Sequence, residues 1–107
     1  MFHITPSDSV SIIMHDGLVP AEHGLYFADS IENAFLMALM MVNEGEKQPG
    51  WFTILEVDLS DVSFEYFIED EHSVGSNLGH YYRAMPTATI PPNLITTISQ
   101  ISIEESD

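Results

Sequence analysis

Apolar and polar residues alternate along several short segments of the chain, and this period of two is typical of β-strands. Two short apolar segments near the N-terminus, Phe2–Pro6 and Leu25–Ala28, are also predicted as strands, because each stops at a turn or at the start of a helix. The other predicted strands follow residue 50 and comprise 51–59, 63–68, 80–85 and 96–103. In the first of these, one face carries Trp51, Thr53, Leu55, Val57 and Leu59, and the other carries Glu56 and Asp58.

Apolar side chains spaced three and four residues apart predict two helices in the first half of the chain. The first is short and ends at Gly17, a residue suited to the left-handed position after a helix. The second follows Asp29, which we expect to cap it, with Glu32 in the capping-box position. This second helix is apolar nearly all round, so we assign it, including the methionines of 37–41, to the core.

Early helices and mostly late strands predict an α+β fold with one dominant sheet, and the length fits residues 1–107 as a single domain. Segment 69–79 has no period and much turn chemistry, so we expect a long exposed loop there. We find neither a secretory signal nor an apolar run long enough to span a membrane. The sequence therefore predicts a cytoplasmic protein with no membrane partner.

The charge is strongly acidic, with 17 Asp and Glu against only Lys47 and Arg83, a formal net charge of −15. Such a surface repels phosphate backbones, which argues against a direct nucleic-acid partner. Two interpretations remain: a solvated surface that resists aggregation, or an acidic patch that occupies the basic groove of a nucleic-acid-binding protein. The chain has no cysteine, and its five histidines show no helical pair with a glutamate, so we predict no metal site.

Short motifs recur in an order that resembles the ADP-ribosyltransferase superfamily, in the diphtheria-toxin-like branch that includes small RNA 2′-phosphotransferase-like domains. In chain order they are Phe-His-Ile-Thr-Pro, Asp-Gly-Leu, Gly-Leu-Tyr-Phe-Ala-Asp-Ser, Ile-Glu-Asn-Ala, Leu-Glu-Val-Asp-Leu and Ile-Pro-Pro-Asn-Leu-Ile. The resemblance covers nearly the whole chain. It implies a split antiparallel sheet with two early helices, and an NAD cleft lined by a His, a Tyr and an acidic residue on three strands.

By this resemblance, His3 and Tyr26 are the candidate catalytic residues: His3 is implied to bond the adenosine-side ribose of NAD, and Tyr26 to pack on the nicotinamide ring. Thr5, Tyr82 and Arg83 complete the candidate cofactor site, with Arg83 suited to a pyrophosphate. Three of these residues also have a structural interpretation: His3 as a polar residue capping a strand, Tyr26 as a core aromatic, and Arg83 as a salt-bridge partner.

Two departures from the family pattern bear on catalysis. The glycine usually found after the histidine is Ile4 here. The strand before Ile-Pro-Pro, which carries the family's catalytic glutamate, has no carboxylate, since none lies between Glu71 and Glu104. Without an acidic group to polarise the ribose hydroxyl and stabilise an oxocarbenium-like centre, we expect transfer to be slow or absent.

Three functions follow as hypotheses. The first is a small ADP-ribosyltransferase-like protein that binds NAD or a related nucleotide and modifies a macromolecular partner. The second is a non-enzymatic acidic inhibitor, of the phage or mobile-element type, which mimics nucleic acid and blocks a basic nucleic-acid-binding protein, as an anti-CRISPR does. The third is an accessory domain without a ligand.

Overall fold

The computed structural model describes residues 1–70 and 79–104, so most of the loop predicted at 69–79 lies outside the described residues. Its strands are β1 (Phe2–Pro6), β2 (Leu25–Ala28), β3 (Gly50–Val57), β4 (Phe64–Glu69), β5 (Tyr81–Pro86) and β6 (Ile95–Ile103). The two α-helices are α1 (Val10–Asp16) and α2 (Ile31–Asn43), and the short 3₁₀ helices are η1 (Ser7–Ser9) and η3 (Pro92–Leu94). The predicted α+β class with two early helices is confirmed, and every predicted strand is present within about two residues of its expected ends.

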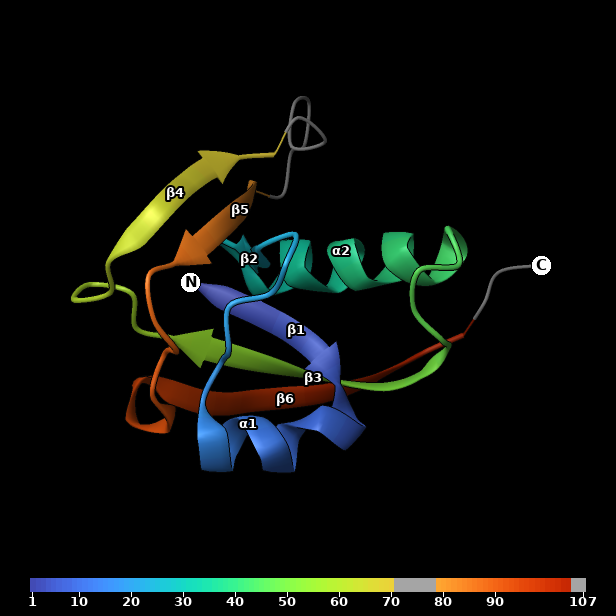
Figure 1. Ribbon diagram of the computed structural model, residues 1–107. Helices are drawn as coiled ribbons and strands as arrows, with labels where there is room; N and C mark the ends of the chain where they lie inside the picture. The colour runs from blue at the N-terminus through green and yellow to red at the C-terminus, as the bar shows by residue number, and fades with distance from the viewer. Residues whose placement is uncertain (71–78, 105–107) are drawn as a thin grey trace.

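The strands form one six-stranded sheet in the order β4-β5-β2-β1-β3-β6, with each neighbouring pair antiparallel (Figure 1). The pairing is uneven. Five residues of β1 pair with β3, whereas β1 and β2 share only the pair Phe2↔Ala28. The sheet therefore consists of two three-stranded parts, β4-β5-β2 and β1-β3-β6, with a narrow hydrogen-bonded join.

Helices lie on both faces of this sheet, α2 on one and α1 on the other (Figure 1). This explains why both faces of β3 are apolar: Phe52 and Ile54 pack with α2, while Leu55 and Val57 pack on the α1 face. The alternation predicted for residues 51–59 is confirmed for Thr53, Leu55 and Val57, which are fully buried. Trp51, next to the start of the strand on the same face, is 61% exposed.

The start of α2 differs from the prediction. Ser30, not Asp29, is the N-cap, and its Oγ accepts a hydrogen bond from the backbone N–H of Asn33 at 3.1 Å. Asn33 therefore holds the third helical position that we assigned to Glu32, so the capping box is wrong. Asp29 instead ties the sheet together, because its Oδ1 accepts the backbone N–H of His80 at 2.8 Å. Among the described residues, no helix is long and apolar enough to cross a membrane.

Candidate functional site

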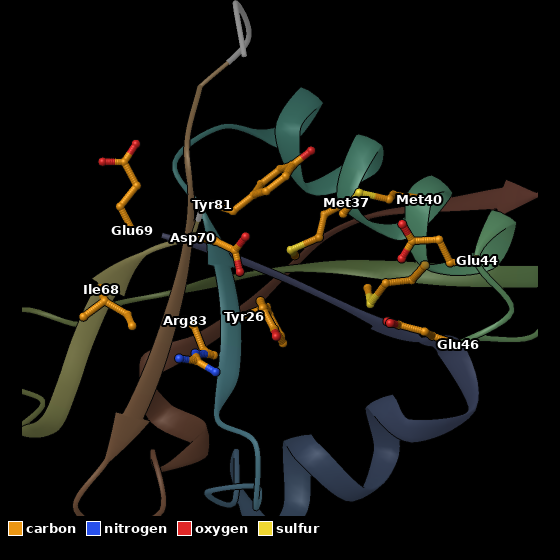
Figure 2. Close-up of a pocket in the computed structure, with 11 residues that line it drawn as sticks. Tyr26, Met37, Met40, Glu44, Glu46, Ile68, Glu69, Asp70, Tyr81 and Arg83 are labelled. Carbon is orange, nitrogen blue, oxygen red and sulfur yellow. The ribbon is translucent and has the colours of Figure 1, made fainter. Parts of the chain in front are cut away.

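A cavity of about 520 Å³ opens between α2 and the part of the sheet formed by β2, β5 and β4 (Figure 2). Tyr26 of β2 and Arg83 of β5 form its sheet-side wall. The two residues are direct partners in the antiparallel register, which places their side chains next to each other on the same face. Two of the five residues predicted from the sequence for the cofactor site are thus brought together here.

The guanidinium carbon of Arg83 lies 5.6 Å from the centre of the Tyr66 ring, which is within range of a cation–π contact. Within residues 1–70 and 79–104 no ion pair joins Arg83 to a carboxylate, so the structural salt bridge considered as an alternative is not formed there. A cation held by an aromatic face keeps its N–H donors available. Arg83 can therefore offer bidentate donors to an anionic group that enters the cavity.

The opposite wall comes from α2, through Met37, Met40 and Met41. Met37 is buried, and the other two are half-buried. We had assigned these methionines to the core, and for Met37 this is confirmed. Their spacing of three and four residues was a signal for one continuous surface, and flexible thioether side chains suit a wall that adapts to a ligand.

Carboxylates line the cavity from two directions. Glu44 and Glu46 follow α2, and Asp70 follows β4 beside Tyr81 (Figure 2). The backbone N–H of Asp70 donates to the carbonyl of Tyr81 at 2.9 Å, which fixes the backbone position from which the Asp70 side chain extends. Sequence reasoning had placed Asp70 in an exposed loop and missed that β4 pairs with β5 and brings it to the cavity.

Glu69 also borders the cavity, but its side chain turns away from Tyr26 and Tyr81 (Figure 2). Its carboxylate pairs with the Nδ1 atom of His80. Tyr81 keeps its proton well into the alkaline range, since burial, helped by the charge of Asp70, raises the pKa of its phenol. The cavity therefore combines tyrosine hydroxyls, carboxylates and one guanidinium with the apolar wall of α2 methionines.

His3 lies outside this cavity but is joined to it through the backbone. Its Nδ1 atom is 2.8 Å from the carbonyl oxygen of Tyr26. Because a carbonyl oxygen can only accept, we assign the proton to Nδ1, which leaves Nε2 of the neutral ring as an acceptor. Burial lowers the pKa of His3. The hydrogen bond to Tyr26 raises the pKa and partly offsets this effect, whereas the positive charge of Lys47 lowers the pKa further. His3 is thus a neutral ring that holds β2 beside β1.

Thr5 and Tyr82 lie on the sheet face opposite to Tyr26 and Arg83. Strand alternation puts Thr5 on the same side as His3, and the His3 ring lies 5.6 Å from that of Phe27, on the α1 face. Tyr82 stacks on Phe67 with ring centres 5.2 Å apart, next to the contact between Phe67 and Phe27. The structure therefore separates the five predicted residues into Tyr26 and Arg83 at the cavity and His3, Thr5 and Tyr82 behind it.

Ile4, which stands where the resemblance implies a glycine, is only 5% exposed and packs with α2. It therefore shares the α2 face with Tyr26, and its side chain fills space that a glycine would leave open. Comparison of the chain with protein-family models, with curated proteins and with solved structures finds no significant match.

Proposed function

We propose that this protein is a small ADP-ribosyltransferase-like domain that binds NAD or a related nucleotide in the cavity under α2. The observation that carries the proposal is the direct pairing of Tyr26 with Arg83 on the cavity wall. An aromatic face beside a guanidinium is suited to bind a nucleotide, because the base or nicotinamide ring can stack on the tyrosine and a phosphate can accept hydrogen bonds from the arginine.

The arrangement of strands supports the same proposal. Strands β1, β2 and β5, to which the resemblance assigns the three site-bearing strands, are neighbours in the sheet. The single residue pair between β1 and β2 leaves the sheet close to divided, which is compatible with the split sheet that the resemblance implies. His3 serves here as a positioning residue, since its hydrogen bond to the Tyr26 carbonyl fixes the strand that presents the tyrosine.

A carboxylate would speed ADP-ribosyl transfer by polarising the ribose hydroxyl and stabilising the oxocarbenium-like centre, and β5 supplies none. Asp70 is the acidic residue that lies beside Tyr81 on the cavity rim, and we propose that it takes this part. Asp70→Asn should then leave nucleotide affinity within a few fold and abolish any turnover, which release of nicotinamide from NAD would report. Unchanged turnover in this variant would remove Asp70 from the mechanism.

Calorimetric titration of NAD into the purified protein tests the binding site, with Tyr26→Ala and Tyr82→Ala as a matched pair. Both variants lose one half-buried tyrosine, on adjacent strands and on opposite faces of the sheet. We expect Tyr26→Ala to weaken NAD binding at least about tenfold, the loss of one stacking contact, and Tyr82→Ala to leave it nearly unchanged. Equal affinities in the two variants would show that the nucleotide does not bind in this cavity.

A second candidate function, an acidic inhibitor of a basic protein, is favoured by the charge around the same cavity. Glu44 and Glu46 stand at the C-terminal end of α2, where the helix dipole is already negative and the last turn carries no basic residue. Such a site attracts cations. A complex formed in this way should weaken steeply with salt, and charge reversal at Glu44, Glu46 and Asp70, which line the cavity, should abolish it. Affinity that does not change with ionic strength would contradict this function.

A further inference from the structure

A second hollow, of about 550 Å³, lies at the start of β3, around Trp51. Pro6, Asp8 and Ser9 border it on one side, and the segment from Glu46 to Gly50 borders it on the other. We call this hollow the Trp51 groove. It is separate from the wall that carries Tyr26 and Arg83, although Glu46 borders both hollows.

Trp51 is held in an exposed position by its neighbours. The adjacent Phe52 and Thr53 are 1% and 0% exposed, and the Oγ1 atom of Thr53 is hydrogen-bonded at 2.8 Å to the Oγ of Ser7 in η1. Because Trp51 and Thr53 lie on the same side of the strand, the indole projects beside η1. It is the only tryptophan of the chain and remains 61% exposed. A large aromatic side chain fixed at the surface by a rigid strand is typical of a binding anchor.

The charges of the groove select the partner. Asp8 and Glu46 contribute two carboxylates and Lys47 one ammonium group, on a chain whose formal net charge is −15. An exposed indole face beside carboxylates fits a flat cation, since a guanidinium can stack on the ring and donate hydrogen bonds to the carboxylates at its edge.

We propose that the Trp51 groove binds an arginine side chain of a basic protein partner. This arginine binding is a different activity from nucleotide binding under α2. It depends on the second candidate function only in that it assumes a basic protein partner. Arginine is preferred over lysine because the ammonium group of lysine is compact and strongly hydrated and has no flat face to stack.

Fluorescence of Trp51 tests the proposal directly, because the chain has no other tryptophan. The probes are two blocked peptides, one of six arginines and one of six lysines. We expect a saturable change in emission with the arginine peptide, and calorimetry should show that it binds more tightly than the lysine peptide. Trp51→Ala should weaken the arginine peptide about tenfold and remove the preference over lysine. Asp8→Asn and Glu46→Gln should each weaken it, and Lys47→Gln should strengthen it.

Ile98→Ala is the matched control, because Ile98 is another exposed apolar side chain, 40% accessible, on the neighbouring strand β6. It should leave both affinities unchanged. Retention of the arginine preference in Trp51→Ala, or peptide binding without a change in emission, would overturn the groove proposal. If Trp51→Ala still bound the arginine peptide and this binding weakened with salt, the second candidate function would remain supported, but its binding surface would lie outside the Trp51 groove.

Discussion

His3 is kept neutral by burial, and this makes the stability of the fold depend on pH. The folded-state pKa of His3 lies below the ordinary value of 6.5, at which the unfolded chain titrates. As the pH falls below that value, the unfolded state binds a proton at His3 that the folded state does not yet bind, so the free energy of unfolding decreases. Above it, both states are neutral and the contribution is constant.

Thermal denaturation followed from pH 7 to about pH 5 should therefore show a loss of stability that His3→Gln reduces, since glutamine can donate to the Tyr26 carbonyl without titrating. His15→Gln is the control, because the His15 side chain is 85% exposed. Acid sensitivity that is the same in wild type and His3→Gln would refute the assignment of a buried neutral imidazole.

Gly17 and Gly45 both adopt positive φ, at 89° and 79°, but their surroundings differ. A Cβ on Gly17 would collide with the backbone oxygen of Ile90, whereas a Cβ on Gly45 would meet open space. We expect Gly45→Ala to cost about 1 kcal/mol through backbone strain and Gly17→Ala about 2–4 kcal/mol, because overpacking adds to the strain. Urea denaturation measures the free energy of unfolding of both variants. Equal decreases would show that the backbone at Ile90 moves to accommodate the added Cβ without cost.

The N-terminus of α2 depends on Ser30, whose side chain caps the backbone N–H of Asn33. Ser30→Ala should lower the free energy of unfolding by about 1 kcal/mol. Glu32→Gln, a change at the residue that the sequence had placed in a capping box, should change it by less than about 0.5 kcal/mol. Chemical denaturation of the two variants checks that Ser30 is the N-cap. A larger loss of stability in Glu32→Gln than in Ser30→Ala would instead support the capping box predicted from the sequence.

The order and type of the elements follow from local patterns, which explains why they could be predicted. The short apolar runs at Phe2–Pro6 and Leu25–Ala28, and the helical spacing up to Gly17, depend only on nearby residues. The exposure of Trp51 could not be predicted, because alternation gives the side of a strand and not whether another element covers it at that point. Ser30 and Asp29 are both good caps, and a contact with His80, fifty-one residues away, decides between them.

The cavity depends on strand register, which no local pattern contains. Tyr26 meets Arg83 because β2 and β5 pair at that position, and the same register sends Tyr82 to the opposite face. Asp70 reaches the cavity through the pairing of β4 with β5, and the α2 methionines through the packing of that helix on the sheet. Tyr26 and Arg83 could be predicted as site residues, but their grouping with Asp70 and the α2 methionines could not.

The molecule as a whole carries a charge of −15 with only two basic side chains, so its carboxylates repel one another in the compact state. Salt screens this repulsion, since the Debye length falls to about 3 Å at 1 M. We expect the melting temperature to rise by several degrees between low and high sodium chloride, as differential scanning calorimetry can measure. A melting temperature that falls with salt would mean that attractive ion pairs dominate the charge energy.

The methionine methyl groups can report whether the cavity under α2 holds a nucleotide against Tyr26 and Arg83, as we propose. In protein labelled with ¹³C at these methyls, NAD should shift the signals of Met37, Met40 and Met41, which line the cavity. The signals of Met1 and Met14, which lie away from it, should stay in place. Shifts confined to Met1 and Met14, or no shift at millimolar NAD, would contradict the account.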